Sequence, residues 1–128
     1  TDSCTDAIYL ACRYLNVESK IITIPKRTYI SVPQSILQAG ATLSFEDLDW
    51  KGVYQLKPTP IYDSAKRLTS NMYIPGSYMC LSFHHKKHLK IGKGGMILTD
   101  DLEAVTKIKK MRINLATIIS NNAFSMFK

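Results

Sequence analysis

The sequence predicts an α/β fold with a largely parallel sheet. In the first half of the chain, segments with apolar residues at helical spacing alternate with short β-branched segments. The order helix, strand, helix, strand is typical of α/β proteins, because strands joined through a helix pair in parallel. The chain has 128 residues, of which 45% are hydrophobic and 21% are charged, and this suits one globular domain with a core of its own.

Two helices and two strands are expected before residue 46. Ser3 and Asp6 have the spacing of a capping box at a helix start. Pro25 stops the first β-branched run, while Pro33 and Gly40 bracket a second helix. The expected elements are a helix at 5–14, a strand at 20–24, a helix at 32–39 and a strand at 41–45.

The second half is less regular, but it contains further strands and a last helix. Residues 46–60 predict a long connection with one extended piece at 53–56, and a short apolar run then leads to Asp63. Asp100 or Asp101 is expected to cap the last helix. The other expected elements are a loop at 68–76 and strands at 78–83 and 96–99, whereas 114–128 has no pattern that predicts a structure.

A polar segment at 82–95 lies between two apolar runs that predict buried strands. It contains three histidines, four lysines and three glycines. Residues with a chemical role are concentrated in loops that a rigid scaffold holds in place. We therefore expect this segment to carry the function of the chain.

Composition excludes some classes of protein. The net charge of +7 permits binding to phosphates, but the basic residues are spread over the whole chain and no nucleic-acid-binding motif is present. Cys4, Cys12 and Cys80 are odd in number and form no CxxC pair, which favours reduced thiols in the cytoplasm over disulfides or zinc. No signal peptide or apolar run of membrane-spanning length is visible, and the start at Thr1, directly at a helix start, suggests a truncated chain.

Three positions next to the expected elements could bind a ligand. The hydroxyl-rich helix start at Thr5 offers free amides to an anion, although a well-capped helix explains it equally. Tyr29 follows a strand and could stack on a planar ligand or simply pack. Asp63 ends an apolar run and could cap the next helix or direct a carboxylate into a site.

Five segments, in order along the chain, carry motifs. They are Ser3-Cys4-Thr5-Asp6-Ala7; Ile24-Pro25-Lys26-Arg27-Thr28-Tyr29 with Ala39-Gly40-Ala41-Thr42; Asp47-Leu48-Asp49; Ile61-Tyr62-Asp63-Ser64-Ala65; and Ser82 to Lys87 with Gly92 to Asp100. Together they resemble the signatures of the pyridoxal 5'-phosphate (PLP) dependent sugar aminotransferases, the DegT/StrS group. The resemblance covers most of residues 2–113.

This resemblance implies a fold, a reaction and partners. The fold would be part of the large PLP-binding domain of the fold type I aminotransferases, a three-layer α/β/α arrangement with a mostly parallel sheet, without the small C-terminal domain. The chain, 1–128, would form this single domain. The reaction would move an amino group from an amino acid, such as glutamate, to a keto-sugar nucleotide. Such enzymes are homodimers whose active site is shared between subunits.

The resemblance also implies roles for individual residues. Lys87, five residues after Ser82, matches the lysine that forms the Schiff base with PLP and moves the proton. Asp63 would pair with the pyridinium nitrogen of the cofactor, so that Lys87 and Asp63 would be the catalytic residues. The expected cofactor-binding residues are Cys4, Thr5, Tyr29, Asp63, Lys66, Ser82 and Lys87, where Tyr29 would stack on the ring, Cys4, Thr5 and Ser82 would hold the phosphate, and Lys66 would lie near the cofactor's oxygen side.

Some positions depart from the family pattern. Cys4 replaces a glycine, Lys66 stands where the family has Gln or His, and His88 stands where Asn is common. The connection at 49–60 is also much shorter than in most members. A relative in which histidine replaces the lysine would be a PLP-dependent sugar dehydratase, and Lys87 favours transamination over that reaction.

Three other readings of the segment at 82–95 stay open. One is a non-catalytic phosphate- or nucleotide-binding module, whose lysines and glycines would contact the anion, although the Walker pattern is missing. The second is a metal site at His84, His85 and His88, for which no acid at ligand spacing is present nearby. The third is a solvated loop, which would leave the other motifs unexplained.

Overall fold

The computed structural model describes residues 1–83 and 92–126, and side chains as far as residue 114. The helices of this part are α1 (Cys4–Tyr14), α2 (Ser31–Gln38) and α3 (Leu102–Met126). Its strands are β1 (Ile21–Pro25), β2 (Thr42–Glu46), β3 (Tyr54–Leu56), β4 (Ile61–Asp63), β5 (Tyr78–Ser82) and β6 (Gly95–Leu98).

The helix ends follow the capping residues of the sequence. Ser3 accepts a hydrogen bond from the backbone nitrogen of Asp6 at 3.0 Å and so caps α1. Asp101 accepts one from the backbone nitrogen of Ala104 at 3.0 Å and caps α3, which decides between the two expected acids. Every expected helix and strand is confirmed to within two residues at its start. α3, however, runs well beyond Met111, the last of the apolar residues at helical spacing that predict it (Leu102, Val105, Ile108 and Met111).

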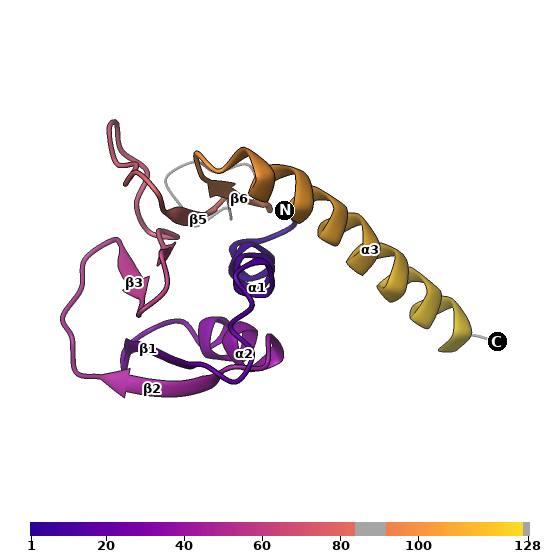
Figure 1. The fold of residues 1–128 in the computed structure, drawn as a ribbon, viewed down its shortest axis with the longest axis horizontal. Helices are drawn as coiled ribbons and strands as arrows, with labels where there is room; N and C mark the ends of the chain where they lie inside the picture. The colour runs from indigo at the N-terminus through magenta and orange to yellow at the C-terminus, as the bar shows by residue number, and fades with distance from the viewer. Residues whose placement is uncertain (84–91, 127–128) are drawn as a thin grey trace.

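The extension of α3 to Met126 has two causes that the apolar pattern does not report. No glycine or proline occurs after Gly95, so nothing in the sequence stops the helix. Asn114, Asn121 and Asn122 are weak helix formers and interrupt the apolar spacing, which hides the helix from a periodicity argument. In Figure 1 the last turns of α3 extend away from the rest of the chain.

The strands form two named sheets that a short bridge connects. β1 and β2 pair in parallel, and the second sheet has the order β3-β4-β5-β6. Thr23 of β1 exchanges two backbone hydrogen bonds with Lys57, directly after β3, at 2.9 and 3.1 Å. The two sheets therefore continue one another across β1 and β3.

The sheet is less parallel than the sequence led us to expect. β4 and β5 pair in parallel, but β3 with β4 and β5 with β6 are antiparallel. The reason is clearest for β3, because the four residues between Leu56 and Ile61 are too few for the crossover that a parallel pair needs. The short connection thus places an antiparallel strand in the middle of the sheet.

A core of aliphatic side chains joins the helices to the sheet. Ile8 of α1, Ile22 of β1, Ile36 of α2 and Ile61 of β4 are each 0–1% exposed. Burying a side chain of this size contributes about 1.5–3 kcal/mol. α1 contacts β4, β5, β6 and both other helices, so it is the element around which the core is built.

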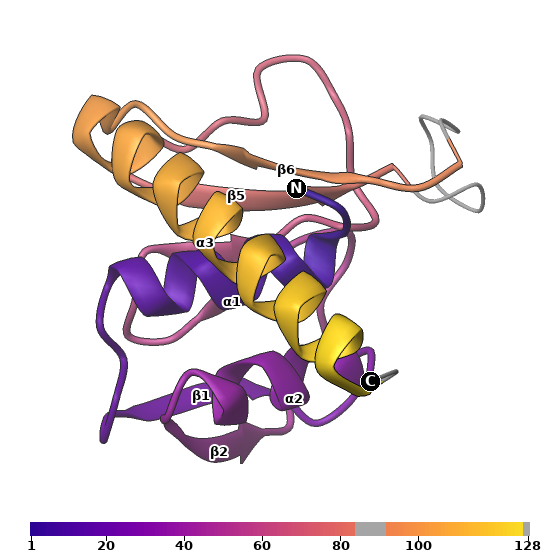
Figure 2. The ribbon, with the colours of Figure 1, turned by 90° about the vertical axis from the view of Figure 1, so that its right-hand side faces the viewer.

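The helices lie on one side of the strands. Figure 1 shows the strands curving around α1 and α2, and Figure 2 shows α3 crossing in front of α1. In the described part of the chain we see a mixed α/β arrangement with the sheet on one side and the helices on the other. The three-layer α/β/α arrangement that the resemblance implied is therefore not confirmed.

Candidate active site

The ends of three strands and the start of α1 meet at one edge of the sheet. β1, β4 and β5 run in the same direction, because β4 and β5 are parallel and both β1 and β4 are antiparallel to β3. Their last residues, Pro25, Asp63 and Ser82, lie at this edge. Cys4 lies there as well, because its Sγ is 4.0 Å from Oδ1 of Asp63. This is the edge at which α/β proteins bind ligands.

Asp63 is a buried carboxylate within a network of hydrogen bonds. Its side chain is 6% exposed. The Tyr54 hydroxyl donates to Oδ2 at 2.8 Å, and the backbone nitrogen of Ala65 donates to Oδ1 at 3.0 Å. A further hydrogen bond joins the hydroxyls of Tyr54 and Thr28. Donors of this kind favour the charged form of a carboxylate, so the network stabilises a buried anion at the edge of the sheet.

Burial and the neighbouring acid also act on Tyr54. Burial raises the pKa of the Tyr54 hydroxyl, and the nearby charge of Asp63 raises that pKa further. The tyrosine therefore keeps its proton throughout the neutral range. It can serve Asp63 as a hydrogen-bond donor at neutral pH.

The start of α1 is packed directly against β6. The amino group of Thr1 donates to the carbonyl of Gly95 at 3.0 Å, and the backbone nitrogen of Gly95 donates to the carbonyl of Thr1 at 2.9 Å. A Cβ atom on Gly95 would overlap the carbonyl of Ser3. The glycine is thus needed for the close approach that brings Cys4 to Asp63.

Thr5 contacts the start of α2. Its hydroxyl donates to Oγ of Ser31 at 2.9 Å, and the Ser35 hydroxyl donates to the carbonyls of Ser31 at 2.8 Å and Thr5 at 3.3 Å. These contacts hold the first turns of the two helices together. Thr5 is half-buried and lies next to Cys4, so the structure brings the first two expected phosphate-binding residues to the Asp63 edge.

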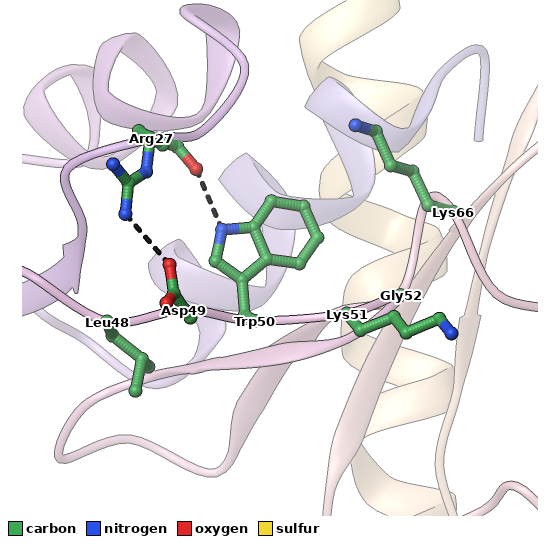
Figure 3. Close-up of a pocket in the computed structure, with 7 residues that line it drawn as sticks. All are labelled: Arg27, Leu48, Asp49, Trp50, Lys51, Gly52 and Lys66. Atoms are coloured by element: carbon green, nitrogen blue, oxygen red, sulfur yellow. Dashed lines mark hydrogen bonds and ion pairs between the residues drawn. The ribbon is translucent and has the colours of Figure 1, made fainter.

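Tyr29 and Lys66 are exposed, in contrast to the buried Asp63. Tyr29 is 73% exposed, and the Lys66 Nζ lies 5.4 Å from the ring centroid of Trp50. Trp50 lines a pocket of about 400 Å³, together with Arg27 and Lys66, which lie on either side of its ring (Figure 3). The Trp50 ring contacts that of Tyr54 edge-on at 4.7 Å, so this pocket adjoins the Asp63 network.

Ser82 ends β5 and pairs with Gly95 of β6. The backbone nitrogen of Phe83, the next residue, donates to the carbonyl of Gly94 at 2.9 Å. The residues before and after the segment 84–91 are thus hydrogen-bonded to one another at the edge that holds Asp63. Lys87 itself, with the rest of 84–91, lies outside the described residues, and its assignment stays a prediction.

Two residues of this site, Tyr54 and Thr28, were not assigned from the sequence. Tyr54 falls in the irregular connection, and no motif marks it. Its role is visible once β3 is paired with β4, because Tyr54 and Asp63 are direct partners in that pair. Thr28 lies within a quoted motif, and its position after β1, at the same edge, was the signal that could have identified it.

The other expectations about composition can be compared with the described residues. In that part of the chain no group of three or more His, Cys, Asp or Glu side chains could hold a metal ion, and His84, His85 and His88 lie outside it. None of the helices described is long and apolar enough to cross a membrane. All three cysteines are buried.

Comparison with known proteins supports the resemblance over part of the chain. The model of the DegT/DnrJ/EryC1/StrS aminotransferase family matches residues 73–117. This match spans β5, β6, the first part of α3 and the lysine motif that starts at Ser82. No curated protein matches the chain. The predicted resemblance to this family is confirmed over the matched segment, and aminotransferases of this family are generally PLP-dependent.

The residues at the Asp63 edge fit PLP. The cofactor needs an acid at its ring nitrogen and donors for its phosphate. Asp63 supplies a buried carboxylate whose orientation is set by hydrogen-bond donors, and the Thr5 hydroxyl and the start of α1 lie at the same edge. A carboxylate in this position can pair with a cationic ring nitrogen.

Proposed function

We propose that this chain is the cofactor-binding part of a PLP-dependent aminotransferase. It would move an amino group from an amino acid, such as glutamate, to a keto-sugar nucleotide. The observation that carries this proposal is the position of Asp63. It is a buried carboxylate beside the start of α1, at the edge from which the family-matched lysine segment leaves β5.

Each residue at this edge has a part in the proposed reaction. PLP, when bound, supplies an electron sink that stabilises negative charge at the Cα atom of the amino acid. Asp63 would keep a proton on the ring nitrogen of the cofactor, because a carboxylate beside that nitrogen favours its charged form. Lys87 carries the cofactor and moves a proton to and from the substrate carbon.

The remaining residues bind and orient. Ser82 donates a hydroxyl hydrogen bond to the phosphate, together with the backbone at Cys4. Thr5 donates to the phosphate once its hydroxyl turns away from Ser31, and Tyr29 covers one face of the ring. Tyr29 is 73% exposed, which leaves its ring accessible to a ligand. Lys66 stands near the cofactor's oxygen side. We also propose a homodimer and a cytoplasmic location, and the odd number of cysteines, all buried, agrees with a reducing compartment.

Borohydride reduction tests this function. The purified chain is incubated with PLP and reduced, and its peptides are then mapped by mass spectrometry. We expect a pyridoxyl group on Lys87, its loss in Lys87→Ala, and its retention in the matched control Lys86→Ala. Lys86 is the adjacent lysine, so the control separates the position of the amine from its mere presence.

Other outcomes would contradict the proposal. A pyridoxyl group spread over many lysines, and unchanged in Lys87→Ala, would mean nonspecific reaction with surface amines. No adduct on any lysine would favour the non-catalytic phosphate-binding module. Retention of the chain on a phosphate-bearing column, and its release by salt, would then support that module.

A further inference from the structure

We propose that Tyr54 is a positioning residue, which holds the Asp63 carboxylate in place for the ring nitrogen of PLP. This inference rests on the proposed function and adds to it a residue from the irregular connection at 49–60. Tyr54 is the first residue of β3, the short antiparallel strand that this connection places next to β4.

The hydrogen bonds define a direction from Thr28 through Tyr54 to Asp63. A tyrosine hydroxyl has one proton, and that of Tyr54 is donated to Oδ2 of Asp63 at 2.8 Å. In the hydrogen bond between Tyr54 and Thr28, the threonine must therefore be the donor. Each hydroxyl strengthens the donor character of the next, because hydrogen bonds in a chain polarise one another.

The Tyr54 ring is fixed on several sides. Tyr54 is 4% exposed and lies opposite Asp63 in the pairing of β3 with β4, so both side chains project from the same face of the sheet. The Trp50 ring packs edge-on against it with centroids 4.7 Å apart. Trp50 is held in turn, because its indole Nε1 donates to the carbonyl of Arg27 at 2.7 Å.

This fixed donor determines how the carboxylate can act. Oδ2 of Asp63 accepts from Tyr54, and Oδ1 accepts from the backbone of Ala65 at 3.0 Å. A carboxylate oxygen can accept more than one hydrogen bond, so these donors fix the orientation of the carboxylate without excluding a further donor. They also favour the charged form, which is the form that retains a proton on a pyridine nitrogen.

The test compares Tyr54→Phe with a matched control. Tyr62→Phe makes the same chemical change one residue before Asp63 on β4, where the side chain projects to the opposite face of the sheet. Three quantities are measured for the full chain and both variants. They are PLP affinity by equilibrium dialysis, the pH at which the ring nitrogen of bound ¹⁵N-labelled PLP loses its proton, by NMR, and the temperature of unfolding.

We expect Tyr54→Phe to bind PLP about 10-fold more weakly, since a hydrogen bond to a charged group is lost. Its bound PLP should lose the ring proton at lower pH than in the unchanged chain, and Tyr62→Phe should match the unchanged chain in both measurements. A purely structural role for Tyr54 would change the unfolding temperature and leave the titration of the ring nitrogen unaltered. That result would overturn the inference.

Two further outcomes are distinguishable. If the unchanged chain binds no PLP, the proposed function fails and the positioning role fails with it. If the unchanged chain binds PLP and both phenylalanine variants titrate like it, the positioning role alone is wrong. Should Tyr54→Phe not fold, Thr28→Val replaces it. This variant removes the first donor of the chain and leaves the Tyr54 ring, and we expect a smaller change in the same direction.

Discussion

A Cβ atom on Gly95 would lie 2.6 Å from the backbone nitrogen of Cys4, at the start of α1. Strand β6 therefore reaches the helix start only because residue 95 has no side chain. We expect Gly95→Ala to destabilise the protein by about 1–3 kcal/mol, because neither backbone can move without disturbing the core. The free energy of unfolding in urea measures this cost.

Gly76→Ala is the matched control for Gly95→Ala. Gly76 has a φ of 77°, and nothing lies within 4 Å of a Cβ atom placed on it. Its substitution costs about 1 kcal/mol through backbone strain alone. An equal or smaller cost for Gly95→Ala would mean that α1 and β6 separate easily, and it would contradict the close approach.

Asp101 should make the free energy of unfolding depend on pH in the acid range. It accepts hydrogen bonds from the hydroxyls of Tyr78 at 2.7 Å and Tyr14 at 3.2 Å and from the backbone of Ala104 at 3.0 Å. These bonds, that of Tyr78 first, lower the pKa of Asp101 below its ordinary value of 3.8. A lowered pKa in the folded state means that the stabilisation is complete above the unfolded value and is lost as pH falls below it.

Asp101→Asn tests this dependence. Asparagine keeps an acceptor oxygen but does not titrate, so its free energy of unfolding should fall less than that of the unchanged chain between about pH 6 and pH 3. Asp100→Asn is the control. It makes the same chemical change at the neighbouring residue, which accepts a hydrogen bond from the backbone nitrogen of Gly76 at 3.3 Å but none of the three bonds that Asp101 accepts. Parallel pH curves for the unchanged chain and Asp101→Asn would show that these bonds do not stabilise the fold.

Local signals in the sequence were enough for most of the fold. Ser3 caps α1 through a pattern of neighbouring residues, and Pro25 ends β1 in the same local way. The pairing of β3 was not predictable, because a strand of three residues has little periodicity and its register depends on β4. The same long-range pairing makes the sheet less parallel than expected.

The candidate site was likewise predictable only in part from local signals. Asp63 was predicted from its motif and is a buried carboxylate at the expected edge. Tyr54 was missed, because it enters the site through tertiary pairing and no spacing along the chain indicates it. Lys87 was predicted by its distance from Ser82, and it stays a prediction.

The buried cysteines predict low thiol reactivity in the folded protein. Burial raises the pKa of Cys12 to about 12 and raises that of Cys80 well above its ordinary value. Since the thiolate is the reactive form, we expect iodoacetamide to label both residues only as fast as the chain unfolds. Pulse labelling at increasing urea, followed by peptide mapping, measures this. Labelling of all three thiols in full denaturant is the control, and rapid labelling of Cys12 without urea would contradict its burial.

Tyr54 predicts a loss of stability at alkaline pH. Burial, and then the charge of Asp63, raise its pKa above the ordinary value of 10, so the folded state keeps a proton that the unfolded chain releases. Its contribution to stability is complete below about pH 10 and declines above it.

The variant Tyr54→Phe tests this dependence. At neutral pH it should lower the free energy of unfolding by about 1–3 kcal/mol, because the buried Asp63 loses a hydrogen-bond donor. The free energies of unfolding of the variant and the unchanged chain, measured in urea, should then converge as the pH rises above about 10. A constant difference between them would mean that the Tyr54 hydroxyl titrates alike in the folded and unfolded states, and that it is not the buried donor on which the Asp63 site depends.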